Sequence, residues 1–282
     1  MMNDIKYFIT VSETLNVTRA SEIIGLSQPA LSYAIKRLEN ELGGQLLIRL
    51  KNGIQLTKFG ETFKQHARRL LSEWEQAQNL IDPESGFIQG NYTFALHPSV
   101  ALCTLENFMP ALQAEFPILD FNFIHGLSRE MTEKVINWEA DFGIVVNPIK
   151  HPDLVITQLY NDEITIFHAK NVKNAKNIKN KLIYDKNLAQ SNHILKKMGK
   201  KIAFKGVLNS SNLEVVAKLT SLGLGYGLLP TRVAHHYKNL TRLKEAPAFK
   251  DDICLVYRHE KHNNVISKKI IQIIKSNMIH SY

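Results

Sequence analysis

The stretch VTRASEIIGLSQPALSYAIKRLENELGGQLLIR, residues 17–49, decides the fold of the N-terminal region. It contains two helical patterns with Gly25, Leu26 and Ser27 between them. Ser27 is a good N-cap for the second helix, and Pro29 falls in the first turn, where a missing N–H does no harm. Apolar residues then follow at helical spacing: Leu31, Ala34, Ile35, Leu38 and Leu42. One face of this helix is therefore predicted to belong to a core.

The opposite face of the same helix is polar and carries Gln28, Ser32, Tyr33, Lys36 and Arg37. An α-helix fits the major groove of DNA, where Gln and Ser exchange hydrogen bonds with base edges and Lys or Arg meets guanine or phosphate. Two helices joined by a tight turn, the second with such a face, predict a helix-turn-helix. The alternatives are a three-helix bundle with a solvated polar face and, for Arg37, an ion pair with Glu41.

Two further helices are predicted before this one. The first runs from about Asn3 to Leu15, with an apolar stripe of Ile5, Phe8, Ile9 and Leu15. The second begins after Thr18, a good N-cap, and ends at Gly25, which readily adopts the left-handed conformation of a helix end. Its buried residues should be Ala20, Ile23 and Ile24.

The segment LLIRLKNGIQLTKFG, residues 46–60, predicts a β-hairpin. Asn52-Gly53 is a strong two-residue turn between two short strands, and Arg49 and Lys51 lie on the first arm. A hairpin at this place is the wing of a winged helix, and its cations would lie beside a phosphate backbone. We therefore expect base-edge contacts from Gln28, Ser32, Tyr33 and Lys36, and phosphate contacts from Arg37, Arg49 and Lys51.

Thr57 should cap a long helix that ends at about Ile81. Its apolar residues repeat every 3.5 positions, which favours pairing with a second helix, in a second copy of the chain. The expected dimerisation residues are Phe63, Ala67, Leu70, Trp74, Ala77 and Ile81. The alternative is a long helix that packs on its own domain. Residues 82–90, DPESGFIQG, break the pattern with Pro and Gly and are expected to form a linker.

From Asn91 strand and helix patterns alternate, which predicts an α/β region with a parallel sheet covered by helices on both faces. The first strands are expected in YTFALHPSV, LDFNFIHG and DFGIVVN, and the first helices in LENFMPALQAEFP and REMTEKVINWEA. Later strands are expected at 163–169, 181–185 and 252–258, a helix, Gly-rich turn and strand at 212–230, and a final amphipathic helix from about Ser267.

Composition describes a globular protein with an uneven charge. The net charge is +9, yet residues 1–80 contribute only +2 (ten Lys and Arg against eight Asp and Glu), so most of the excess lies in the C-terminal half. A claim of DNA binding must therefore rest on local pattern. No apolar run is long enough to span a bilayer and the N-terminus does not look like a signal peptide, so we expect no membrane partner and a cytoplasmic location.

The order ASEIIGLSQPALSYAIKRLENELGGQLLIR followed by GIQLTKFGETF resembles the N-terminal domain of the LysR-type transcriptional regulators. LTSLGLGYGLLP resembles the Gly-rich segment of their effector-binding domain. The resemblance covers essentially the whole chain. Four positions depart from the family pattern: Leu47 and Ile48 stand where a phenylalanine is usual, Phe59 replaces an alanine, and Tyr33 replaces a polar or basic residue.

The resemblance implies a multidomain α/β chain. Residues 1–58 would form a winged helix-turn-helix and residues 59–90 a linker and dimerisation helix with a hinge. Residues 91–282 would form a two-lobed effector-binding domain like the periplasmic binding proteins, with lobe I at about 91–160 and 260–282 and lobe II at about 161–259. It also implies operator DNA as a partner, homotetramers built from dimers, contact with RNA polymerase, and a small-molecule effector in place of a cofactor.

Ligands of open α/β sheets bind at the carboxyl ends of strands. Four loops after predicted strands are therefore candidates, and they carry Ser99, Val100, Ser128, Val146, Asn147, Leu208, Asn209 and Ser210. Each serine is alternatively only a helix cap. Arg129 is the single arginine near these loops, which favours a small, partly apolar or mono-anionic ligand over a diacid.

Three other readings stay open. An enzyme is disfavoured because no GxSxG, P-loop, HExxH or strand-linked GxGxxG motif is present, although the pairs His235-His236 and His259 with His262 raise a metal site that we do not expect. A second reading keeps the regulator fold but has it sense redox state through Cys103 or Cys254. A ligand-binding protein without specific DNA reading is the third reading.

Overall fold

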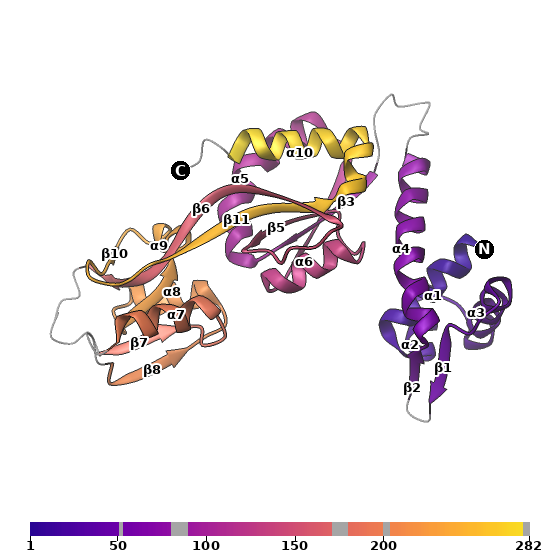
Figure 1. The fold of residues 1–282 in the computed structure, drawn as a ribbon, viewed down its shortest axis with the longest axis horizontal. Coiled ribbons are helices and arrows are strands. Elements are labelled where there is room, and N and C mark those ends of the chain that lie inside the picture. Colours follow the sequence, from indigo (N-terminus) through magenta and orange to yellow (C-terminus); the bar gives the residue numbers. More distant parts are fainter. Residues whose placement is uncertain (51–52, 80–89, 171–179, 200–203, 279–282) are drawn as a thin grey trace. The chain divides into compact units, whose positions relative to one another are not determined.

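The computed structural model describes residues 1–50, 53–79, 90–170, 180–199 and 204–278 (Figure 1). Lys51 and Ile81, two of the predicted site residues, lie outside this part of the chain. The chain divides into two compact units. The first comprises Met1–Tyr92 with Ile118–Phe121 and Ile136–Ala140, and the second comprises the remaining residues. None of the described helices is long and apolar enough to cross a membrane.

The N-terminal unit is built on three short helices, α1 (Met2–Thr14), α2 (Val17–Ile24) and α3 (Gln28–Leu42). The Ser27 side chain accepts a hydrogen bond from the N–H of Ala30, as a helix cap should. The three helices enclose one apolar core, whose buried residues are Ile5, Phe8, Val11, Ala20, Leu31, Ile35, Leu38, Leu46, Leu56 and Ala67. The predicted helix-turn-helix is confirmed.

Three local predictions in this unit were wrong. The N-cap of α2 is Asn16, which accepts from the N–H of Arg19, so the helix begins before Thr18. On the short helix that results, Ile23 faces outward and is 63% exposed. Leu15 does not belong to the apolar stripe of α1, because it has a left-handed φ of 49° and turns the chain toward α2. Its carbonyl accepts from the N–H of Ile54 in the wing.

The wing consists of the antiparallel strands β1 (Leu47–Leu50) and β2 (Gly53–Leu56). It leads directly into α4 (Lys58–Asn79). The Oγ1 atom of Thr57 accepts from the N–H of Gly60 at 2.8 Å, which confirms the predicted cap. The same hydroxyl donates to the carbonyl of Gln45, and the N–H of Thr57 donates to the carbonyl of Leu46. These bonds fix the base of the wing to the start of α4.

Replacement of Gly60 by alanine is expected to destabilise this junction. A Cβ atom at position 60 would stand 2.1 Å from the carbonyl oxygen of Leu46, a backbone atom that cannot turn aside. Overpacking of this kind costs about 1–3 kcal/mol. Thermal unfolding should show the loss for Gly60→Ala and not for Gly206→Ala, whose new Cβ would lie at least 3.7 Å from its neighbours. Equal melting temperatures for the two variants would contradict this account.

The second part of the chain is a mixed α/β fold. Its strands are β3 (Gly90–Leu96), β4 (Leu119–His125), β5 (Phe142–Val146), β6 (Leu154–Ala169), β7 (Lys181–Tyr184), β8 (Gly206–Asn209), β9 (Tyr226–Pro230), β10 (Leu240–Arg242) and β11 (Phe249–Arg258). Its helices are α5 (Pro98–Glu115), α6 (Ser128–Ile136), α7 (Ala189–Met198), α8 (Leu213–Ser221), α9 (Thr231–His235), the 3-10 helix His259–Asn263 and α10 (Val265–Met278).

The described strands of this part form one sheet in the order β4-β3-β5-β11-β6-β9-β7-β8, with β10 beside β6. We call β3, β4 and β5 with α5, α6 and α10 lobe I, and β7 to β10 with α7, α8 and α9 lobe II. The prediction of a parallel sheet was wrong, because the sheet is mixed. β3 pairs with β5 and β7 with β8 and β9 in parallel, but β11 is antiparallel to both β5 and β6.

The strands β6 and β11 run through both lobes (Figure 1). β6 covers 16 residues and includes the segment predicted as the separate strand 163–169. Ile253 pairs with Tyr160 and Cys254 with Gln158, so Leu159 is the extra residue of a β-bulge. On the lobe I side of the bulge β11 pairs with β5, and on the lobe II side β6 pairs with β9 and β10.

Candidate functional site

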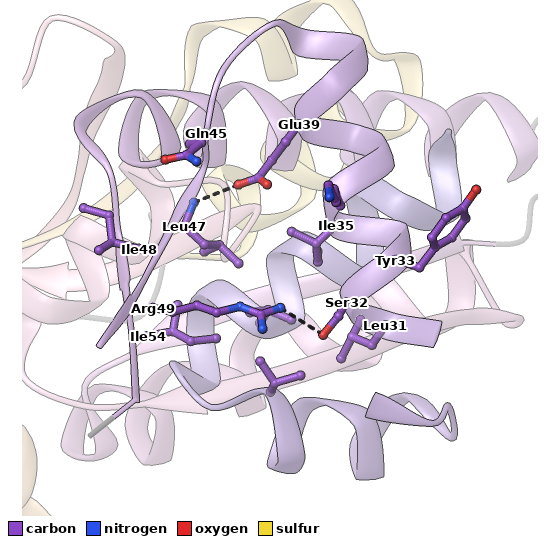
Figure 2. Close-up of a pocket in the computed structure, with 13 residues that line it drawn as sticks. Leu31, Ser32, Tyr33, Ile35, Glu39, Gln45, Leu47, Ile48, Arg49 and Ile54 are labelled. Carbon is purple, nitrogen blue, oxygen red and sulfur yellow. Dashed lines mark hydrogen bonds between the residues drawn. The ribbon is translucent and has the colours of Figure 1, made fainter. Parts of the chain in front are cut away.

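A hollow of about 570 Å³ lies between α3 and the wing (Figure 2). Its polar lining residues are Ser32, Tyr33, Lys36, Glu39, Gln45 and Arg49. The Glu39 carboxylate accepts from the N–H groups of Leu46 and Leu47, which holds the first wing strand against α3. Arg49 extends across the hollow and donates to the hydroxyl of Ser32 at 3.2 Å. α3 and the wing therefore present polar side chains next to one another around this hollow, whose other lining residues are apolar.

A neighbouring hollow of about 380 Å³ adds Gln28 to these side chains and shares Ser32 and Arg49 with the first. The Gln28 amide donates to the hydroxyl of Thr18 at 2.9 Å, which orients its carbonyl oxygen. Lys36 is exposed, and Tyr33 is 69% exposed and points away from the wing (Figure 2). The structure thus brings together Gln28, Ser32, Lys36 and Arg49 and sets Tyr33 to one side.

Arg37 has a structural partner that its sequence neighbours do not reveal. Its guanidinium donates through Nε and one terminal nitrogen to both carboxylate oxygens of Asp4, at 2.8 and 2.5 Å. Asp4 is 1% exposed, whereas half of the Arg37 side chain faces solvent. The partner is Asp4 on α1, and not Glu41 as the helical spacing suggested. This ion pair joins α1 to α3.

The ion pair of Arg37 and Asp4 should make the stability of this unit depend on pH in the acid range. The hydrogen bond from Arg37 holds the pKa of Asp4 below its ordinary value of 3.8. A depressed folded pKa stabilises the fold above the unfolded value, and this stability is lost as pH falls through the folded pKa. Melting temperatures between pH 5 and pH 2 should fall more steeply for the natural chain than for Arg37→Gln. Arg129→Gln, which removes an exposed pair with Glu133, should keep the natural slope.

The predicted dimerisation stripe of α4 divides into two parts. Ala67 is buried and Phe63 half-buried in the core of their own unit, and the Phe63 ring lies 5.3 Å from that of Phe8. For Phe63 and Ala67 the alternative prediction is therefore the right one: this part of α4 packs on its own domain. Leu70 and Trp74 are 46% and 45% exposed, and Ala77 is exposed as well.

The exposed half of the stripe borders an apolar groove of about 560 Å³ between α1, α3 and α4. Its lining residues are Met1, Met2, Ile5, Leu38, Glu41, Leu42, Phe63, Leu70, Glu73, Trp74 and Ala77. Contiguous apolar surface of this kind is typical of a protein interaction site.

A smaller cavity of about 190 Å³ lies between the two lobes, and all of its lining residues belong to the second compact unit. Its lining residues are His97, Leu127, Ser128, Val146, Ile164, Asn187, Leu188, Ala189, Gln190, Leu213, Pro230, Arg232 and Asp251. Of the eight residues predicted for the effector site, this lining includes Ser128 and Val146. The Ser128 hydroxyl accepts from the N–H of Val146 at 3.0 Å, which joins the start of α6 to the end of β5.

The other predicted effector residues lie outside the lining. Val100 is fully buried in α5, and Ser99 lies one step behind the cavity, where its hydroxyl contacts Arg232. Leu208 and Asn209 are the last residues of β8, the outer strand of the sheet, and Ser210 follows them. The prediction used every loop at the end of a strand. The order of the strands places the loop after β8 at the edge of the sheet, away from the cavity.

Two buried charged centres close to the cavity were not predicted. The Arg232 guanidinium donates to Asp162 at 2.6 Å and to Ser99 at 3.2 Å. Asp251 is 2% exposed and its Oδ1 accepts from the amides of Asn147 and Gln190, at 2.8 and 3.1 Å. Asp162 on β6 and Asp251 on β11 are directly opposite each other in the sheet. These residues could have been found in the sequence, because each is a charged residue within an apolar strand or short helix.

His97 and the two cysteines are shaped by burial. Burial and the nearby Arg232 charge lower the pKa of His97 to about 4, so its ring is neutral near pH 7. Burial raises the pKa values of the Cys103 and Cys254 thiols to about 11, so both remain protonated and weakly nucleophilic. This disfavours the reading of the chain as a thiol-based redox sensor.

The histidine pairs contact different groups. His236 lies 3.2 Å from the Cys103 sulfur, His262 3.1 Å from the Tyr257 hydroxyl, and His259 3.0 Å from the Pro152 carbonyl. Within the described part of the chain, no group of three or more His, Cys, Asp or Glu residues is arranged to hold a metal ion.

Two family models match the chain, and between them they span both parts of it. Residues 2–61 match the bacterial regulatory helix-turn-helix protein of the lysR family, and residues 85–278 match the LysR substrate binding domain. Among curated proteins the chain is similar to the nitrogen assimilation regulatory protein nac of Escherichia coli (strain K12), with 33% identity over 144 residues, 50% of this chain and 47% of the relative. The chain spans about half the length of the first curated relatives it matches.

Solved structures share the whole fold. A variant of full-length OxyR from Pseudomonas aeruginosa matches with a TM-score of 0.67 and 20% identity, over 99% of this chain and 98% of that one. Full-length CbnR in complex with its target DNA matches with a TM-score of 0.62 and 19% identity over 100% of both chains. Together with the family models, which match more than half of the residues, these results show that the chain belongs to the LysR family of bacterial regulatory proteins.

Proposed function

We propose that the chain is a sequence-specific DNA-binding transcriptional regulator and not an enzyme. The observation that carries this proposal is the polar surface formed by Gln28, Ser32, Lys36 and Arg49, which joins the exposed face of α3 to the wing. A helix with such a face enters the major groove, where Gln28, Ser32 and Lys36 contact base edges. Arg49 in the wing contacts phosphate, and Lys51 and Arg37 are further candidates for that role. Tyr33 would pack against a thymine methyl group at the side of the helix.

The regulator is proposed to bind as a dimer. Leu70, Trp74 and Ala77 leave an apolar stripe exposed on α4 beside the groove of α1 and α3. A second copy of the chain that covers this surface would place two recognition helices on a two-fold symmetric operator. Assembly into tetramers and contact with RNA polymerase extend the same proposal.

The cavity between the lobes is the proposed effector site. It is lined by residues of both lobes and of the two strands that they share, so a ligand there contacts residues on either side. Binding would change the arrangement of the lobes and through it the binding of operator DNA or the activation of a promoter.

Selection of bound sequences from a random duplex pool at fixed salt tests the DNA-binding proposal. A two-fold symmetric consensus with half-sites separated by whole helical turns is expected. The double variant Ser32→Ala, Lys36→Ala should bind that consensus about 10- to 100-fold or more weakly, because each good base contact contributes roughly 1–3 kcal/mol. Binding should persist in Lys268→Ala, a cation on α10, the C-terminal helix. A pool without enrichment would contradict the proposal.

A further inference from the structure

We propose that the cavity between the lobes takes a small zwitterion of the α-amino acid type. Its ammonium group would lie against Asp251 and its carboxylate against the donors of Ser128 and His97. The inference rests on the proposed function, because it names the class of compound that the regulator senses. The charge of the cavity, its hydrogen-bond donors and its size each support it.

The charge of the cavity calls for a cation. Among the described residues that line it, Arg232 and Asp251 are the charged ones. Arg232 is already neutralised by Asp162, with which it forms an almost fully buried ion pair. Asp251 receives hydrogen bonds from the neutral amides of Asn147 and Gln190. Arg232 thus supplies one positive charge for two buried carboxylates, Asp162 and Asp251. Because buried charge that is not fully compensated is costly, an ammonium group beside Asp251 would be favoured.

The cavity also has hydrogen-bond donors without an acceptor, and these favour an anionic group of the ligand. The N–H of Ser99 donates to Nδ1 of His97 at 3.3 Å, so that nitrogen carries no proton and the neutral ring is protonated on Nε2. The Ser128 hydroxyl accepts from Val146, which leaves its proton free to donate. Nε of Arg232 is buried without an acceptor among the described residues. A carboxylate of the ligand would satisfy donors of this set.

The size and walls of the cavity limit the rest of the ligand. At about 190 Å³ it is little larger than the roughly 150 Å³ cavity that holds a benzene molecule in another protein. The part of a ligand that lies inside the cavity is therefore limited to about ten non-hydrogen atoms. The remaining surface is largely apolar and consists of Leu127, Val146, Ile164, Leu188, Leu213 and Pro230. A short aliphatic side chain matches these walls.

Binding of matched compounds to the purified full chain, measured by calorimetry, tests the inference. The probes are L-alanine, L-valine and L-leucine, and for each the amine that lacks the carboxylate and the acid that lacks the ammonium group. At least one amino acid is expected to bind, and its amine and acid at least about 10-fold more weakly. An amine or an acid that binds as tightly as its amino acid, or a panel in which nothing binds, would overturn the inference.

Variants assign the two ends of the ligand. Asp251→Asn keeps an acceptor for Asn147 and Gln190, yet it should weaken amino acid binding at least about 10-fold. Asp252→Asn removes the neighbouring exposed carboxylate and should leave the affinity for the amino acid unchanged. Equal affinities of the natural chain, Asp251→Asn and Asp252→Asn would overturn the inference. If Asp251→Asn does not fold, Ser128→Ala tests the carboxylate end, since it should weaken the amino acid and leave the amine unaffected. DNA binding is measured separately, by selection of sequences with the ligand-free protein. Absence of amino acid binding can therefore be distinguished from absence of sequence-specific DNA binding.

Discussion

Replacement of Arg232 by methionine is expected to destabilise the effector-binding part of the chain by about 3–5 kcal/mol. Arg232 is the cation of a buried centre in which Asp162 and Asp251 lie opposite each other on β6 and β11. Methionine keeps much of the apolar volume but removes the charge, so two facing carboxylates would remain buried without it. Thermal or urea unfolding at neutral pH measures the loss.

The pH dependence of this variant distinguishes electrostatics from packing. Burial already raises the pKa of Asp251, and removal of the Arg232 charge, which lowers that pKa, should raise it further. A raised folded pKa destabilises the fold above that pKa, and the penalty disappears once the pH falls below the unfolded value. The difference in stability between the natural chain and Arg232→Met should therefore narrow as the solution is acidified. A constant difference would indicate a packing defect instead.

The neighbouring pair of Arg242 and Glu163 provides the matched control. Glu163 follows Asp162 on β6, and its carboxylate accepts from Arg242 at 2.8 Å, but both side chains are about half exposed (47% and 50%). An ion pair in water contributes about 0–1 kcal/mol. Arg242→Met should thus melt close to the natural chain. Similar losses in the two variants would contradict the claim that burial decides the effect.

The second large effect is expected from charges placed on the exposed stripe of α4. In the double variant Leu70→Glu, Trp74→Glu the proposed dimer should weaken by at least about 100-fold. Leu70 and Trp74 are each about half exposed, and the apolar surface that they would bury in an interface contributes roughly 25 cal/mol per Å². Four introduced carboxylates would also face one another in the pair. Sedimentation equilibrium measures the assembly, and affinity for the selected operator should fall with it because both half-sites are then no longer read together.

Gln65→Glu is the control for this experiment, since it adds a charge to an exposed position of α4 outside the groove lining. It should assemble and bind as the natural chain does. The double variant should also keep its melting behaviour, because the core of the unit is formed by Ala67 and the residues around it. A double variant that still forms dimers would show that α4 is not the pairing element.

Local signals made the N-terminal elements predictable from sequence. Ser27, Pro29 and Thr57 act on the backbone within three or four residues of themselves, and each does so in the structure. The bond between Asp4 and Arg37 spans 33 residues and follows from how α1 packs on α3, which no local pattern encodes. The exposure of Ile23 depended in the same way on a shift of the helix start.

The effector cavity was harder to predict because strand order decides which loops meet. Ser128 follows β4 and Val146 ends β5, both in lobe I, and both line the cavity. Arg232 and Asp251 reach it from α9 and from the late strand β11, which returns antiparallel through the sheet. The preference for a mono-anionic ligand rested on the candidate loops alone, and the cavity lining adds Arg232 and Asp251 to them.

The bulge at Leu159 limits how the effector-binding part can respond to a ligand. Because β6 and β11 continue through both lobes, the lobes cannot separate without breaking backbone hydrogen bonds of the ladder. What remains is torsion of a two-stranded ribbon, and a bulge is where the twist of such a ribbon is greatest. A compound far smaller than either lobe would thus be detected as a change of angle, amplified by the length of the elements on each side of Leu159.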